Sequence, residues 1–162
     1  MKARCRDLAK ARQVAQGLPA KLQGEGDQVD TYFCSPQGRL KLRQSSFDDS
    51  ATVVWYLRAN DASPRPSEYR LARVRSPQNI CEVFTMRFGV LGIVKKHRAV
   101  FIHEGIRINL DTVEGLGDFV EFEAPAGDRP KEAQQAVACL MQAFGIKHSD
   151  LVGESYSDLL LK

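Results

Sequence analysis

The sequence has no long apolar run, no paired cysteines and almost no excess charge. No stretch approaches 18 consecutive apolar residues, so no transmembrane helix is expected, and no apolar run of a secretory signal follows the charged first residues. The four cysteines are widely spaced, which predicts reduced thiols in a cytoplasmic protein rather than a disulfide framework. With 23 basic against 20 acidic residues, the net charge of +3 does not argue for a nucleic-acid or membrane partner.

The length of 162 residues suits one domain with a core, so we expect a single domain over residues 1–162. Capping and periodicity predict helices over residues 8–16, 77–88 and 128–145. Gly17, Pro19, Gly24 and Gly26 predict a loop that lasts until a strand begins at Asp30. Alternating segments predict further strands, and the absence of a β-α-β rhythm indicates an α+β fold with a mainly antiparallel sheet. These segments lie within residues 1–6, 30–44, 51–58, 68–75, 92–103 and 107–123.

The segment RINLDTVEGLGDFVEFE, residues 107–123, is typical of a β-hairpin in which every second side chain is polar or charged. The face opposite Ile108 and Leu110 carries Arg107, Asn109 and Asp111, and the arm after the turn adds Glu121 and Glu123. For one hairpin alone, a charged face that is simply solvated is the ordinary interpretation.

Other predicted strands place basic residues at alternate positions, and these are Arg39, Lys41 and Arg43, then Arg58, then Lys96 and Arg98. Two arrangements fit this pattern. One is an open sheet with a solvated charged face, and the other is a nearly closed antiparallel barrel with a polar lumen. Cations in a lumen repel one another unless they share an anion, and a polyphosphate serves well because Arg and Lys can contact successive oxygens. Carboxylates in the same lumen would hold Mg²⁺ or Mn²⁺ through oxygen ligands.

Several stretches, in this order along nearly the whole chain, resemble the CYTH domains, or triphosphate tunnel metalloenzymes. The stretches are KAR at 2–4, DTYFCSPQGRLKLR at 30–43, VVWYLR at 53–58, SPRPSEY at 63–69, GIVKKHR at 92–98, IRINLDTVEGLGDFVEFE at 106–123 and GESYSDLLL at 153–161. The family includes class IV adenylyl cyclases and thiamine triphosphatase, and the likeness is closest to the cyclase branch. The resemblance implies an eight-stranded antiparallel tunnel that binds a triphosphate through inward Lys and Arg.

The resemblance also implies roles for individual positions. Lys2, Arg58 and Tyr156 would belong to the catalytic set, with Tyr156 helping to close the tunnel. Asp111, Glu121 and Glu123 would bind the metal ion, Mg²⁺ or Mn²⁺. The remaining triphosphate contacts would be Arg4, Arg39, Lys41, Arg43, Arg65, Lys96, Arg98 and Arg107.

One departure concerns the motif Glu-x-Glu-x-Lys on the family's first strand. Lys2 matches the lysine, and Met1 takes the position before it, so that both glutamates would precede the first residue. Either the first strand is truncated in a chain that begins earlier, or part of the metal site has been lost. The second case predicts a protein that binds a triphosphate or polyphosphate without efficient chemistry.

Two functions are therefore expected. The first is metal-dependent processing of ATP, tripolyphosphate or thiamine triphosphate, by cyclisation of ATP or by hydrolysis. The second is non-catalytic binding of the same ligands. Neither function involves nucleic acid or membrane, and a homodimer is compatible with both.

Overall fold

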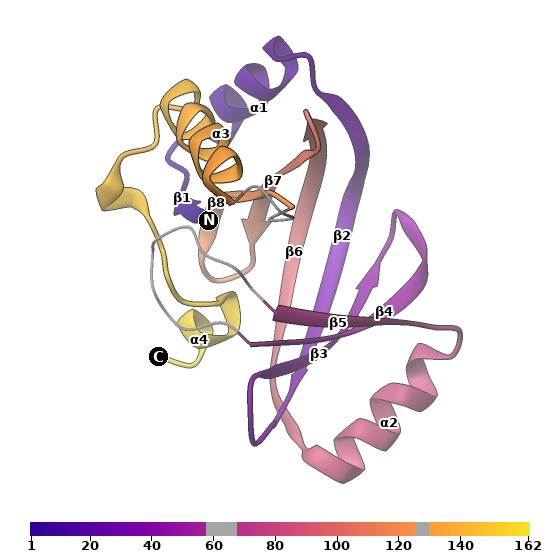
Figure 1. The fold of residues 1–162 in the computed structure, drawn as a ribbon. Coiled ribbons are helices and arrows are strands. Elements are labelled where there is room, and N and C mark those ends of the chain that lie inside the picture. Colours follow the sequence, from indigo (N-terminus) through magenta and orange to yellow (C-terminus); the bar gives the residue numbers. More distant parts are fainter. Residues whose placement is uncertain (58–67, 126–129) are drawn as a thin grey trace.

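The fold is organised around one eight-stranded antiparallel sheet, seen in a computed structural model that describes residues 1–57, 68–125 and 130–162 (Figure 1). The strands are β1 (Lys2–Arg4), β2 (Lys21–Phe33), β3 (Arg39–Ser45), β4 (Asp48–Leu57), β5 (Glu68–Val74), β6 (Val90–His103), β7 (Ile106–Val113) and β8 (Gly117–Glu123). Their spatial order is β1-β8-β7-β6-β2-β3-β4-β5. The predicted α+β class with eight antiparallel strands is confirmed. The sheet is barrel-like, although within the described ranges no hydrogen-bonded ladder joins β1 to β5.

The helices are α1 (Leu8–Gly17), α2 (Pro77–Phe88), α3 (Pro130–Ala143) and α4 (Tyr156–Leu160), with one turn of 3₁₀ helix at His148–Asp150. The predicted cap at Asp7 forms, whereas at α2 the Ser76 side chain makes no capping hydrogen bond and Pro77 marks the start. The Asp7 carboxylate accepts a hydrogen bond of 2.9 Å from the Lys10 amide, and Pro77 follows Ser76 at the first helical position. None of the helices in the described part of the chain is long and apolar enough to cross a membrane.

The predicted loop over Gly17–Gly26 is wrong, because β2 already begins at Lys21 and pairs with β6 from Lys21 opposite Ile102. The glycines belong to the strand because another part of the chain packs against it. A Cβ atom on Gly24 would lie 2.7 Å from Cδ2 of Phe47, in the β3–β4 turn. Glycine in a strand interior can therefore mark the close approach of a neighbouring segment rather than a loop.

The outer face of the sheet is covered by helices. Ile108 and Leu110 of β7, with Phe122 of β8, pack in one buried cluster with residues of α1 and α3. The other half of the sheet is covered by α2, where Phe84 stacks edge-on against Phe33 at 5.3 Å between ring centroids. The apolar side of the strand alternation thus faces the helices, as the sequence predicts.

The C-terminal segment covers part of the opposite face. Tyr156 and Val152 pack against Tyr32, Val94 and Phe119, which point away from the helix-covered face. The rings of Tyr156 and Phe119 are 4.9 Å apart between centroids. A capping box fixes the start of α4: the Ser155 hydroxyl accepts from the Asp158 amide, and the Asp158 carboxylate accepts from the Ser155 amide. This short helix therefore holds Tyr156 against the charged side of the sheet.

Candidate triphosphate site

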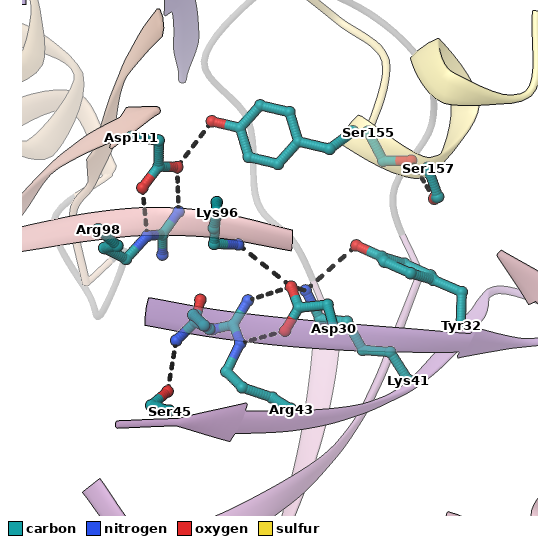
Figure 2. Close-up of polar contacts among 12 residues, drawn as sticks. Asp30, Tyr32, Lys41, Arg43, Ser45, Lys96, Arg98, Asp111, Ser155 and Ser157 are labelled. Carbon is teal, nitrogen blue, oxygen red and sulfur yellow. Dashed lines mark hydrogen bonds and ion pairs between the residues drawn. The ribbon is translucent and has the colours of Figure 1, made fainter. Parts of the chain in front are cut away.

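Polar and charged side chains gather on the face of the sheet that α1, α2 and α3 leave uncovered, here called the inner face. Strand alternation places them there, since their neighbours in sequence pack against the helices. Figure 2 shows labelled side chains from β2, β3 and β6 converging around Asp30. The inner face includes Lys2, Gln28, Asp30, Tyr32, Arg39, Lys41, Arg43, Lys96, Arg98, Asn109, Asp111 and Glu121.

Asp30 is the centre of the first ion cluster on this face and is only 1% exposed. Its carboxylate accepts from Lys41 Nζ at 2.8 Å, from Lys96 Nζ at 3.2 Å, and from Arg43 Nε and Nη2 at 2.8 and 2.9 Å. Burial opposes ionisation, but Arg43, Lys41 and Lys96 together hold the pKa of Asp30 well below its usual range. The carboxylate therefore stays charged and fixes three cations from β3 and β6.

Arg98 is the centre of the second cluster. Its Nε and Nη2 donate to the two carboxylate oxygens of Asp111, both at 2.6 Å, and Nη2 also donates to Glu121 at 3.0 Å. Burial would raise the pKa of Glu121, but Arg98 and Lys2 lower it below its usual range. The Tyr156 hydroxyl donates to Asp111 at 2.7 Å, and burial together with Asp111 raises the pKa of this phenol, which stays neutral. The C-terminal helix is thereby connected to the charged interior.

Lys96 lies between the two clusters and is 5% exposed. Burial lowers the pKa of Lys96 to about 7, and the neighbouring Arg98 and Arg43 act in the same direction, while Asp30 opposes them. Its proton is therefore weakly held at neutral pH. A further negative charge near the lysine would raise the pKa again and would be attracted by the ammonium group.

Cations outnumber carboxylates in these two clusters. Among the described residues, the buried Lys41, Lys96 and Arg98 and the half-buried Arg43 face the buried Asp30 and Asp111 and the half-buried Glu121. A surplus of buried positive charge is unfavourable unless an anion neutralises it. The arrangement is suited to a compact polyanion that can contact Arg and Lys side chains together.

Residues 1–156 match the family model of the CYTH domain. The chain belongs to the CYTH family. The predicted family is thus confirmed, and membership supports a triphosphate-related function. None of the curated protein sequences matches the chain.

Solved structures share this CYTH fold. The PH1012 protein of Pyrococcus horikoshii is similar with a TM-score of 0.88 and 24% identity, over 98% of this chain and 96% of that one. A protein of Vibrio parahaemolyticus described as a candidate adenylate cyclase has a TM-score of 0.81 and 19% identity, over 100% and 96% of the two chains. A Bacillus halodurans protein of the same description has 0.70 and 15%, again over 100% and 96%. At these identities the likeness shows the fold.

The CYTH fold brings most of the predicted site residues together and leaves others apart. The residues that lie on the inner face in contact with its ion clusters or with α4 are Lys2, Arg39, Lys41, Arg43, Lys96, Arg98, Asp111, Glu121 and Tyr156. Lys2 donates to the Glu154 carbonyl and lies over the Tyr156 ring, 4.1 Å from its centroid. Arg39 pairs with Asp158 of α4 at 2.7 Å.

Three predicted residues are solvent-exposed, and two cannot be placed. Arg4 is exposed, lies over the Phe119 ring and donates to the Leu116 carbonyl at 3.2 Å. Arg107 and Glu123 are exposed and lie opposite each other in the β7–β8 ladder, away from α4. Arg58 and Arg65 lie outside the described residues.

Sequence reasoning missed Asp30, whose carboxylate organises the first cluster. A signal was present, because Asp30 and Tyr32 alternate with Thr31 and Phe33 in the same way that Lys41 and Arg43 alternate with leucines. Acidic and basic residues of matching parity on paired strands can meet across the sheet. Asp158, the partner of Arg39, gave no such signal because its strand contact depends on how α4 folds back.

Within the described ranges, Asp111 and Glu121 could together contribute carboxylate oxygens to a metal ion. Among the described residues, no group of three or more His, Cys, Asp or Glu side chains could hold one. Mg²⁺, however, is often bound by one or two protein carboxylates together with substrate phosphates and water. The two acidic side chains would meet that smaller requirement when Arg98 donates to a phosphate instead of to them.

Proposed function

We propose that this chain binds a triphosphate on its inner face and processes it with Mg²⁺ or Mn²⁺. The observation that carries the proposal is the convergence of basic side chains on the buried Asp30. Lys41, Arg43 and Lys96 converge from two strands on one carboxylate. An incoming phosphate chain can accept from the same donors, since ammonium and guanidinium groups bind phosphate as readily as carboxylate.

The proposed metal site uses Asp111 and Glu121. A bound Mg²⁺ or Mn²⁺ would neutralise charge on the phosphates and position the attacking oxygen. Arg98 now donates to both carboxylates, so we expect its guanidinium to turn to phosphate oxygens when the ligand binds. Attack by water would give hydrolysis, and attack by a ribose hydroxyl of ATP would give cyclisation with release of pyrophosphate.

Binding without turnover is the second candidate function. It is favoured by the ion pairs of Arg98, because both proposed metal ligands are already occupied by a cation. In that case the basic inner face would capture a triphosphate or polyphosphate, and the two carboxylates would only orient Arg98.

Phosphorus NMR separates these functions. ATP, tripolyphosphate and thiamine triphosphate are each incubated with the chain and Mg²⁺ or Mn²⁺, and the spectra are followed over time. New phosphate, pyrophosphate or cyclic-nucleotide signals support the catalytic function. Broadened or shifted signals without product support the binding function, and unchanged signals with all three ligands contradict both.

A further inference from the structure

Asn109 in β7 has a buried amide side chain that lacks hydrogen-bond partners. The residue is 0% exposed, and neither Nδ2 nor Oδ1 has a partner among the described residues. Gln28 and His103 each have only one such atom. A buried polar group without a partner costs about 1–3 kcal/mol, and such groups are rare in folded proteins. An amide with both ends unpaired therefore indicates that something else binds there.

The position of Asn109 is defined by the strand register. Its neighbours Ile108 and Leu110 belong to the cluster under α1 and α3, so the Asn109 side chain lies on the inner face. It stands opposite Glu121 of β8 and Val100 of β6. Asp111 lies two residues further along the strand, towards Val113 and the Tyr156 cluster. Asn109 is therefore beside the Arg98 cluster, on the side away from α4.

The inner face offers two kinds of position to a ligand. Lys41, Arg43 and Arg98 are the donors that the phosphates would contact in the proposed function. Asn109 lies next to Glu121, whose carboxylate can accept a hydrogen bond from a neutral donor. A neutral group with hydrogen-bond donors therefore suits the position beside Asn109. The Asn109 amide can both donate and accept. A hydroxyl-bearing group meets this requirement, and a phosphate oxygen would satisfy Nδ2 alone.

We propose that Asn109 is a specificity-determining residue that hydrogen-bonds a neutral, hydroxyl-bearing group attached to the triphosphate. This inference rests on the proposed function, since the cations must first hold the phosphates. It adds that the chain distinguishes an organic triphosphate from inorganic tripolyphosphate. The discrimination comes from the donor-and-acceptor amide and not from the cations, which both ligands contact alike.

The test is a calorimetric titration of ATP and of tripolyphosphate without divalent metal, using the wild type and Asn109→Leu. Leucine has the same branching at Cγ but a larger volume, and it removes both hydrogen-bonding atoms. We expect the variant to bind ATP about tenfold more weakly, as for the loss of one hydrogen bond, and to bind tripolyphosphate within about twofold of the wild type. A melting temperature close to that of the wild type would show that the larger side chain is accommodated without overpacking. Asn79→Leu on the exposed face of α2 is the matched control and should leave both affinities unchanged.

Equal weakening of both ligands in Asn109→Leu would overturn the inference, since the amide would then serve the phosphates or the fold. Unchanged binding of both would overturn it as well. If the leucine variant does not fold, the same ratio of affinities is measured with Asn109→Ala and judged by the same outcomes. A wild type that binds neither ligand would contradict the proposed function itself, and only that result removes both proposals together.

Discussion

Arg98 and Asp111 face each other across β6 and β7 and form a bidentate ion pair, with both N–O distances at 2.6 Å. Asp111 also accepts from Tyr156, so one carboxylate connects the sheet to the C-terminal helix. A buried ion pair adds little stability compared with apolar residues of similar size. Removal of one partner, however, leaves the other charge buried and uncompensated. The pair thus holds the interior in a defined arrangement that a phosphate ligand can enter.

Replacement of Asp111 by Asn tests this arrangement. Arg98 would lose its bidentate partner and keep the single contact with Glu121 among the described residues, so we expect the free energy of unfolding to fall by about 3 kcal/mol. Urea denaturation measures the change. Asp49→Asn at the exposed start of β4 is the control and should change stability by less than about 0.5 kcal/mol. Similar small losses in both variants would show that the buried pair does not organise the interior.

Most of the fold could be predicted from local patterns because capping residues and alternation act within a few positions. Examples are the first residues of α1 and α2, and the placement of Lys96 and Arg98 on one face of their strand. The first half of β2 could not be predicted. Its Gly24 makes room for the ring of Phe47, which lies 23 positions later in the sequence. Contacts at that separation in sequence leave no local signal.

The sequence predicted the basic residues of the two ion clusters. Among the acidic residues it predicted Asp111 and Glu121 but not Asp30. The basic residues on β3 and β6 repeat at alternate positions, which strand geometry turns into one face. The alternation around Asp30 was a usable signal, but its partners on β3 and β6 are known only once β2 is placed between these strands. Arg107 has the parity of Asp111 but is exposed, since parity fixes the face of a strand and not the depth along it.

Adjacent lysines on β6 provide a matched test of the binding face. Lys96 lies on the inner face and Lys95 is exposed on the other side. We expect Lys96→Met to weaken tripolyphosphate binding about tenfold or more, because a charge-assisted hydrogen bond contributes about 1.5–3 kcal/mol. Lys95→Met should bind nearly as the wild type does. Calorimetric titration of both variants gives the comparison, and equal losses would place the ligand away from the inner face.

The same lysine predicts a pH dependence of stability. Burial lowers the pKa of Lys96 from 10.5 to about 7, so between these values the unfolded chain carries a proton that the folded chain lacks. Stability rises with pH wherever the unfolded state binds more protons. We expect the free energy of unfolding of the wild type to increase relative to Lys96→Met from about pH 7 to pH 9. The slope should be at most about 1.4 kcal/mol per pH unit.

Denaturation of both proteins at pH 6, 7, 8 and 9 measures that difference, and other titrating groups cancel in the comparison. Below about pH 7 the lysine is protonated in both states, so the difference should become constant. A difference that does not change with pH above 7 would show that the ammonium keeps its ordinary pKa in the folded protein.

Gly24 in β2 predicts a steric effect that reports on the Phe47 contact. A methyl group at this position would lie 2.7 Å from Cδ2 of the Phe47 ring, so the ring or the strand must move. Overpacking of this kind costs about 1–3 kcal/mol, and we expect Gly24→Ala to lower the free energy of unfolding by that amount. Gly17 at the end of α1 is the control, since no heavy atom lies within 4 Å of its added Cβ. Gly17→Ala should leave stability unchanged or raise it, because alanine favours the helix.

The double variant Gly24→Ala with Phe47→Ala separates the steric effect from strand propensity. If the ring causes the loss, the alanine at position 24 lowers the free energy of unfolding only slightly once the ring is removed. An undiminished cost in that background would mean that β2 is held by something other than close packing of Phe47.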